Sequence, residues 1–391
     1  MPQPLKHLAS GLIHHLPALL LCALCACGGG GGGGGSSTGS TGASSSASSS
    51  KASSQSSTAS VTSSSSSSAS SSKSSSASVA SSTSSSAVSS AVSSAVSSAV
   101  SSASSAGSSV SSGLYLTQPD VATCSPGQLK DSERTAVLNK LNAVRARHGL
   151  AAVSYDSSFD AGAAEAAMYM VANKALTHSP SSGGLCYTAN AASLAGSSNL
   201  HLSWTSGSTT QNIASSDAIV GYLIDDNVSS LGHRRWVLYP FLATTTYGRV
   251  DGQPSGTSNK YMSSVLKVIG GAASSVSMSN DFVAYPYGNY PASEFSTSWF
   301  LSFSVVASKT NANANGSGQV SFAGATITVA RPDNTTLTIS EQSADYAGYG
   351  LANNLQWKVS GLTTGVTYTV TISNVVVNGS TRSFSYNFTL Q

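Results

Sequence analysis

The stretch LGHRRWVLYP, residues 231–240, holds a histidine, two arginines and two aromatic residues in a chain otherwise rich in Ser, Ala, Gly and Thr. Histidine is the side chain whose ordinary pKa lies nearest to neutral pH, so it commonly carries protons or binds metals. The globular part of the chain has four histidines, His148, His178, His201 and His233. The sequence leaves two interpretations of His233 open, as a member of a site or as a hydrogen-bonded residue of the fold.

Several well-known catalytic patterns are absent from the sequence. There is no GxSxG, HExxH or GxxxxGK, and CxxC occurs only in the N-terminal segment. The glycine tract at 28–35 fits GxGxxG, but no strand precedes it, so we expect no nucleotide site there.

The N-terminus has the features of an export signal. Lys6 precedes the short apolar run at 16–26, which is about half the length of a membrane-spanning helix. The run ends in Leu24, a small residue and Cys27, which resembles the lipobox of bacterial lipoproteins. A lipid on Cys27 would anchor the protein to a membrane without a transmembrane helix, and the glycine at 28 favours the outer membrane. An ordinary signal peptide with chance cysteines is the alternative.

Residues 28–112 are almost entirely Gly, Ser, Ala, Thr and Val, with Lys51 and Lys73 as the charged residues. Such a segment cannot bury enough apolar surface to offset its ordering entropy, so we predict a long disordered linker. Its root-mean-square reach would be roughly 50 Å, enough to hold a folded part away from a membrane.

The charge and cysteine content limit the partners. The chain has 15 acidic residues, all beyond the linker, where the same number of Lys and Arg residues lies. A neutral globular part without a basic block excludes a nucleic-acid partner. Two cysteines, Cys124 and Cys186, remain beyond the N-terminal segment, and in an exported protein we expect them to form a disulfide.

Hydrophobic spacing predicts helices first and strands later, the pattern of an α+β domain. We expect helices at 131–149, 158–176 and 216–226, and strands around 234–238, 243–250 and 261–269. After Gly271 the apolar residues alternate with period two between turn-forming stretches, which indicates an antiparallel β-sandwich at 272–391. Within it, Leu362, Gly365 and Tyr368 resemble the tyrosine corner of immunoglobulin-like domains.

Four blocks between residues 131 and 250 agree in order and character with one family. They are LNAVRARHGL through KALTHS, then QNIASSDAIVGYLIDD, LGHRRWVLYP and YGRV. Together they resemble the CAP superfamily of cysteine-rich secretory, antigen and pathogenesis-related proteins, in its bacterial, SCP-like form. The resemblance implies an α-β-α sandwich at 113–271 with a cleft.

The resemblance also implies which residues form that cleft. The first family histidine corresponds to His178, the glutamate of the family's GEN pattern to Gln211, the acid of the third helix to Asp225 and the second histidine to His233. Two histidines with carboxylates would suit zinc, with His178 and His233 as the metal ligands. Gln211 in place of a carboxylate weakens such a site, because a neutral amide binds cations less well.

Other polar residues have structural interpretations. We expect His148 to interact with the end of its helix, His201 to lie exposed in a loop, and Arg234 and Arg235 to pair with Asp225, Asp226 or Asp251. The tyrosine-rich stretch 284–291 is expected to pack across the boundary between the two domains.

The sequence as a whole predicts an exported bacterial protein, an outer-membrane lipoprotein or an extracellular protein. We expect a monomeric, non-enzymatic module that binds a small apolar ligand or a cell-envelope component in the cleft around His178 and His233. A metal-dependent hydrolase in the same cleft, with Asp225 as base or ligand, and an adhesive protein with a vestigial cleft are the alternatives.

Overall fold

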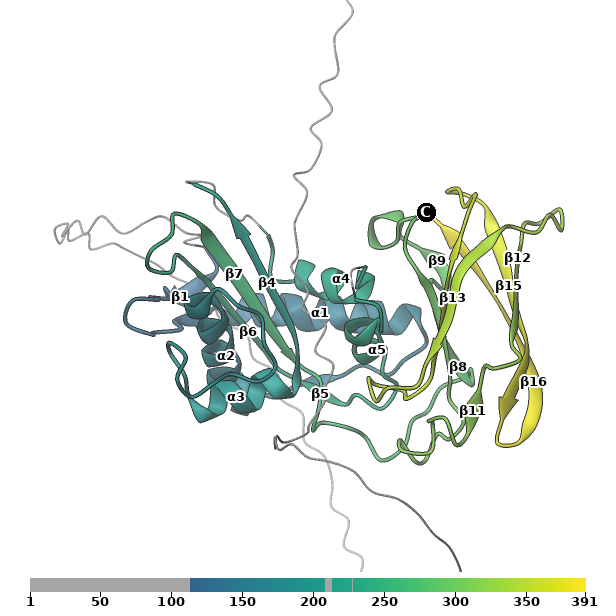
Figure 1. Ribbon diagram of the computed structural model, residues 1–391, viewed down its shortest axis with the longest axis horizontal. Coiled ribbons are helices and arrows are strands. Elements are labelled where there is room, and N and C mark those ends of the chain that lie inside the picture. The colour runs from purple at the N-terminus through teal and green to yellow at the C-terminus, as the bar shows by residue number, and fades with distance from the viewer. Residues whose placement is uncertain (1–112, 208–212, 227) are drawn as a thin grey trace, which may run out of the picture. The chain divides into compact units, whose positions relative to one another are not determined.

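The computed structural model describes residues 113–207, 213–226 and 228–391 (Figure 1). The predicted signal peptide at 1–27 with Cys27, the predicted linker at 28–112 and Gln211 lie outside the described residues. We call residues 113–271 the first part and residues 272–391 the second part, after the predicted domain boundary.

The first part mixes helices and strands. Its elements are β1 (Tyr115–Thr117), β2 (Gln128–Leu129), α1 (Asp131–Arg147), β3 (Ser154–Tyr155), a 3₁₀ turn (Ser157–Phe159), α2 (Asp160–Asn173), α3 (Ala189–Gly196), β4 (Ser198–Thr205), α4 (Asp217–Ile224), α5 (Gly232–Val237), β5 (Thr244–Thr245), β6 (Tyr247–Gly252) and β7 (Lys260–Lys267). β4, β7 and β6 form an antiparallel sheet in that order, so β7 is central and β6 is an edge strand.

Helices cover both faces of this sheet, as the predicted α-β-α arrangement requires. Successive residues of a strand point to opposite faces, and β7 shows this with Val265 and Leu266. Val265 packs in one core with the buried face of α2 and α3, whereas Leu266 packs in a second core with residues of α1, α4 and α5. α2 and α3 therefore bury their apolar sides on one face of the sheet, and α1, α4 and α5 share a core with its other face.

Small residues allow α2 to approach the sheet closely. Ala163, Ala166 and Ala167 are fully buried along the helix. A Cβ atom on Gly248 of β6 would lie 2.3 Å from the carbonyl carbon of Ala163, so only glycine fits there. The alanine-rich side of α2 thus packs on the sheet, and α1, α2 and α4 match the three predicted helices within a few residues at each end.

One of the secondary-structure predictions for the first part is wrong. The stretch 234–238 was expected as a strand but belongs to the short helix α5. Its alternation of apolar and polar residues over five positions is too short to separate a strand from one helical turn. The segment after His178 contains α3, which packs on α2, and β4, which joins the sheet.

The second part consists of two sheets. Its elements are β8 (Phe282–Tyr285), β9 (Gly288–Tyr290), a 3₁₀ turn (Ala292–Glu294), β10 (Leu301–Val305), β11 (Val320–Ser321), β12 (Thr326–Ala330), β13 (Ile339–Asp345), β14 (Asn354–Val359), β15 (Thr367–Val377) and β16 (Ser380–Leu390). One sheet has the order β13-β14-β10-β8; the other has β11-β15-β16-β9, with β12 also paired to β15. All pairings are antiparallel except β9 with β16.

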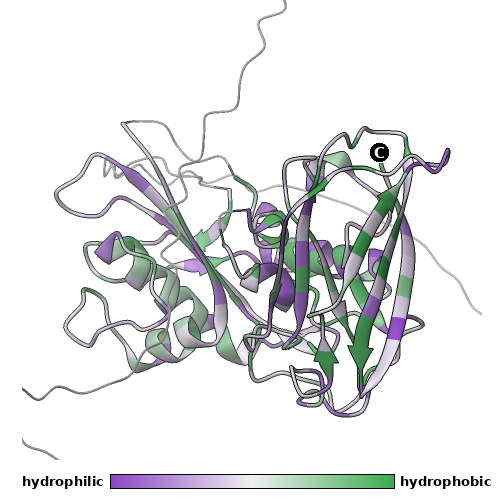
Figure 2. Cartoon of the chain, turned by 45° about the vertical axis from the view of Figure 1, so that its right-hand side comes forward, coloured by the Kyte–Doolittle hydropathy of each residue, from purple (hydrophilic) through white to green (hydrophobic). Residues whose placement is uncertain are grey.

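Hydrophobic and hydrophilic residues alternate along these strands (Figure 2), and aromatic rings from the two sheets contact one another. Phe303 of β10 lies with its ring centroid 5.3 Å from that of Phe384 of β16, and Phe282 of β8 lies 5.9 Å from Tyr386 of β16. At one corner, the Thr363 backbone N–H donates a hydrogen bond of 2.8 Å to the Tyr368 hydroxyl. The second part is therefore held by an aromatic core, with the Tyr368 hydroxyl fixing the backbone at Thr363.

The tyrosine-rich stretch joins the core of the first part to that of the second. Tyr285 and Tyr290 are fully buried, and their rings contact that of His148 at the end of α1. His148 Nδ1 donates to the Ala284 carbonyl at 2.7 Å, so this histidine is a buried contact rather than only a helix-end residue.

None of the helices in the described part of the chain has the length and apolar character needed to cross a membrane.

Candidate functional site

The sharp turn between α4 and α5 places Asp225 beneath His233. Asp225 ends α4 with a positive φ of 48°, and Leu231 enters α5 with a φ of 50°. The side chain of Asp225 is only 1% exposed. One of its oxygens accepts from His233 Nδ1 at 2.8 Å, and the other accepts from the backbone N–H groups of His233 at 2.9 Å and Arg234 at 3.3 Å. Both carboxylate oxygens are thus engaged, one with the ring and one with the start of α5.

The hydrogen bond to Asp225 fixes the orientation and the tautomer of the His233 ring. A carboxylate only accepts hydrogen bonds, so Nδ1 must carry a proton. When the ring is neutral, Nε2 is then left with a free lone pair. The ring keeps partial exposure, with 15% of the side chain open to solvent.

His178 is oriented in the same way by a different partner. It follows α2, and its Nδ1 donates to the backbone carbonyl of Ala195 at the end of α3 at 2.9 Å. Partial burial of the ring and the nearby charge of His233 lower the pKa of His178. Both effects favour the neutral form of His178, in which Nδ1 carries the proton and Nε2 is unprotonated.

His201 joins this group, contrary to the prediction that it lies exposed in a loop. It lies in β4, opposite Ser264 of β7, and is half-buried. Burial, together with the charges of His233 and Arg249, lowers the pKa of His201 to about 4. The alternation of Leu200 and Leu202 with His201 is typical of a strand and could have predicted this position. The many serines around it favoured a loop instead.

The face of the sheet beside His201 is polar. His201, Ser264 and Arg249 lie in one row across β4, β7 and β6. The Tyr222 hydroxyl donates to the Ser264 carbonyl at 3.0 Å, and the Tyr222 ring lies 5.5 Å from that of His233. Arg249 forms a two-bond ion pair with Asp251, at 2.7 and 2.9 Å. We call His178, His201 and His233 the histidine cluster. The row across the sheet places hydroxyl and charged side chains beside this cluster.

The predicted zinc site does not receive a complete ligand set from these groups. Among the residues that the structure describes, no group of three or more His, Cys, Asp or Glu side chains is arranged to hold a metal ion. Asp225 is unsuited as a ligand because both of its oxygens already accept hydrogen bonds. Two imidazoles alone fall short of the three protein ligands of a catalytic zinc site, so the donor set does not fit zinc.

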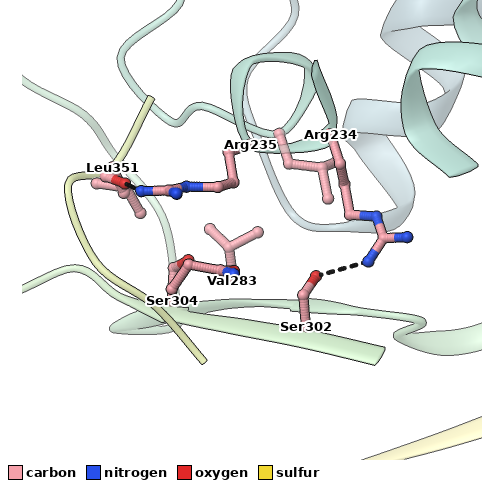
Figure 3. Close-up of a pocket in the computed structure, with 8 residues that line it drawn as sticks. Arg234, Arg235, Val283, Ser302, Ser304 and Leu351 are labelled. Carbon is pink, nitrogen blue, oxygen red and sulfur yellow. Dashed lines mark hydrogen bonds between the residues drawn. The ribbon is translucent and has the colours of Figure 1, made fainter. Parts of the chain in front are cut away.

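The two arginines of α5 contact the second part, and Figure 3 shows them beside Ser302, Ser304 and Leu351. Arg234 donates to the Phe300 carbonyl at 2.9 Å and to Ser302 Oγ at 3.3 Å. Arg235 pairs with Asp345 and donates to the Leu351 carbonyl. The predicted pairing with Asp225, Asp226 or Asp251 is therefore wrong, because the arginines point to carbonyls and to an acid more than 100 residues away in sequence.

The small cavity between these arginines and β10 is structural. Its volume is about 20 Å³, which suffices for about one water molecule. α5 thus has two roles, since one side presents His233 while the other side binds the second part.

Cys124 and Cys186 form a disulfide in the structure, with a Cα–Cα distance of 5.2 Å. The bond joins the segment between β1 and β2 to the loop between α2 and α3. It therefore fastens the segment between β1 and β2 to the loop that carries Cys186.

A comparison with family models agrees with this architecture. The model of the cysteine-rich secretory protein family, CAP, matches residues 138–263. This region is a CAP domain. The match contains α2 and most of the sheet, as well as His178, His201 and His233, so the histidine cluster belongs to the CAP region.

Two solved structures show partial similarity. An extracellular protein containing an SCP domain from Bacillus anthracis str. Ames has 16% identity and a TM-score of 0.23, over 36% of this chain and 42% of that one. An outer surface protein from Borrelia burgdorferi has 14% identity and a TM-score of 0.24, over 35% of this chain and 92% of that one. The chain thus spans less than half of the Bacillus anthracis protein. No curated protein matches the chain.

Proposed function

We propose that the protein is an exported binding module that captures a hydroxyl-bearing component of the cell envelope at the histidine cluster of its CAP region. The observation that carries this proposal is the shared orientation of His178 and His233. Each ring donates from Nδ1 to an oxygen of the protein and leaves Nε2 for a ligand. Neutral imidazole nitrogens accept hydrogen bonds from hydroxyl groups.

The surroundings favour a polar ligand over the small apolar ligand that the sequence left open. The floor beside His201 carries Ser264, Tyr222 and the Arg249–Asp251 pair rather than aliphatic side chains. These side chains are buried and hydrogen-bonded to one another, so they offer an apolar ligand little aliphatic surface to pack against. A glycan suits this polar site, because each sugar ring carries several hydroxyl groups that can form hydrogen bonds.

The engaged carboxylate of Asp225 disfavours the hydrolase alternative. A general base needs a lone pair that reaches water or substrate. Asp225 is buried beneath His233 and holds the start of α5 with its second oxygen. Its position fits a residue that orients His233 for binding.

The N-terminal region and the second part have supporting roles in this proposal. Export and a lipid anchor at Cys27, followed by a flexible linker over 28–112, would display a monomeric binding part at the outer membrane or outside the cell. The tyrosine contact at Tyr368 supports an immunoglobulin-like second part. That part serves as a support for α5 through Arg234 and Arg235.

The proposal is tested with tri-N-acetylchitotriose as the probe and the full-length protein in a calorimetric titration. We expect binding in the wild type and a loss of at least about tenfold in affinity for both His178→Ala and His233→Ala, because each removes one hydrogen bond to the ligand. Lys174→Ala, at the exposed end of α2, is the matched control and should bind like the wild type. Absence of binding, or binding by the two histidine variants equal to that of the wild type, would reject the proposal.

A further inference from the structure

The guanidinium of Arg235 is buried between α5 and the second part, with a side chain that is 3% exposed. One terminal nitrogen pairs with Asp345 and donates to the Ser230 carbonyl at 3.3 Å. The other donates to the carbonyls of Ala347 at 2.6 Å and Leu351 at 2.9 Å. A guanidinium carries five N–H groups, so these contacts leave the one on Nε. Nε is buried and has no hydrogen-bond partner among the residues that the structure describes.

Asn354 of β14 holds a buried acceptor. Its amide nitrogen donates to Gln356 Oε1 at 3.0 Å, and Gln356 Nε2 donates to the Ser229 carbonyl at 2.9 Å. The Ser229 carbonyl can only accept, so Gln356 must turn its nitrogen to Ser229 and its oxygen to Asn354. Asn354 must then turn its own nitrogen to Gln356. This leaves Asn354 Oδ1 buried and without a hydrogen-bond partner in the described part of the chain.

The two residues line one small cavity, the space of about 20 Å³ between α5 and β10 (Figure 3). That volume suffices for about one water molecule. A buried donor and a buried acceptor that both lack partners are unfavourable, and a bridging water satisfies them together. The hydroxyl-bearing residues Ser302 and Ser304 also line the cavity, so the occupant has polar neighbours beyond these two.

The chemistry of the two unpaired atoms distinguishes water from an ion. An anion could accept from Arg235 Nε–H but would be repelled by the amide oxygen of Asn354. A cation could bind that oxygen but would face the positively charged guanidinium. Water accepts and donates at once, so it alone of the three suits both atoms.

We propose that this cavity is a binding site for one water molecule, which accepts from Arg235 Nε–H and donates to Asn354 Oδ1. All five N–H groups of Arg235 then have partners. A continuous chain of hydrogen bonds leads from Arg235 through the water, Asn354 and Gln356 to the Ser229 carbonyl. Both ends of this chain lie in α5 and the turn before it, so the water helps attach the helix that carries His233 to β14.

A crystal structure of the full-length protein, at a resolution that shows ordered water, tests this site directly. We expect one water at about 2.7 to 3.2 Å from both Arg235 Nε and Asn354 Oδ1. Electron density without a water at this place, a water that contacts only one of the two atoms, or a direct bond between them would overturn the proposal.

NMR supplies the same test in solution, on the full-length protein with isotope-labelled arginine side chains. A water held in the cavity should give a nuclear Overhauser effect to the Nε proton of Arg235, measured in the laboratory and rotating frames to separate it from proton exchange. The Arg235→Lys variant, which lacks this signal, assigns it. A signal of Arg235 Nε–H that shows no effect from water contradicts the proposal.

Two matched variants assign the water to Asn354. Asn354→Leu keeps nearly the same shape but cannot accept a hydrogen bond, and it should abolish the effect from water at Arg235. Asn387→Leu, at an exposed position of β16, should retain it. An effect that persists in Asn354→Leu would overturn the assignment. If Asn354→Leu does not fold, the crystal structure and the NMR of the wild type still decide.

Binding of tri-N-acetylchitotriose at the histidine cluster is measured separately, so either proposal can fail without the other.

Discussion

Asp225 and His233 are joined by two hydrogen bonds, one from the imidazole Nδ1 at 2.8 Å and one from the backbone N–H at 2.9 Å. The same carboxylate therefore sets the orientation of the ring and satisfies the start of the helix that carries it. A change at Asp225 should act on fold and site together.

Asp225→Asn is predicted to destabilise the protein by about 2 kcal/mol, because an amide cannot accept from both the ring and the buried backbone N–H groups. Urea unfolding measures this loss, and Asp226→Asn, at the exposed neighbouring position, is the control. An unchanged midpoint for Asp225→Asn would contradict the assigned role.

Buried histidines predict a loss of stability in acid. Burial lowers the pKa of His148 to about 3, whereas an exposed histidine has a pKa of about 6.5. The stabilisation is complete above pH ~6.5 and is lost as the pH falls toward 3, because the unfolded state gains a proton that the folded state does not.

We therefore expect the free energy of unfolding to fall by up to about 1.4 kcal/mol per pH unit for this group below pH ~6. His148→Gln, whose amide can still donate to the Ala284 carbonyl, should show a shallower dependence in urea unfolding between pH 7 and 4.5. An equal slope in the two proteins would exclude His148 as the source.

The disulfide between Cys124 and Cys186 encloses a separation of 62 residues. Its removal should cost about 4 kcal/mol through the greater entropy of the unfolded chain. The double variant Cys124→Ser/Cys186→Ser and the reduced wild type should therefore unfold at similar, lowered temperatures. A reduced wild type that melts like the oxidised protein would show that the bond adds no stability.

Arg234 joins α5 to the second part through the Phe300 carbonyl and the Tyr285 ring, whose centroid lies 4.1 Å from the guanidinium carbon. Arg234→Met should lower the free energy of unfolding by about 3 kcal/mol, because it leaves buried carbonyls without donors. Arg331→Met, which removes a single exposed contact to the Gly361 carbonyl, should cost less than about 1 kcal/mol. Equal effects of the two substitutions in urea unfolding would contradict the role of Arg234.

The sequence predicted the long helices because their apolar residues recur over several turns, as Val137, Leu141 and Val144 do in α1. The prediction of secondary structure failed at α5, because a helix of six residues shows too little periodicity. It also failed at β4, because polar residues occupy one whole face of that strand. The positions of His178 and His233 followed from the family resemblance. The inclusion of His201 and the engagement of Asp225 depend on contacts between distant segments, which local spacing does not encode.

The partners of Arg235 could not be predicted for the same reason. Asp345 and the Leu351 carbonyl belong to the second part of the chain, and only the folded structure brings them to α5. The nearby acids in sequence are equally suited by charge, but the turn at Asp225 directs that carboxylate to the backbone of α5 instead.

The central claim is that His178 and His233 hold their Nδ1 protons inward and offer Nε2 to a ligand. Nitrogen NMR of the imidazole rings at pH ~7.5, without and with tri-N-acetylchitotriose, tests it directly, because the neutral tautomers are then populated. The account predicts Nδ1-protonated rings for both residues and a shift of both Nε2 signals on addition of the glycan, with the signals of buried His148 unchanged. Nε2-protonated rings, or signals of His178 and His233 that do not move with the glycan, would contradict it.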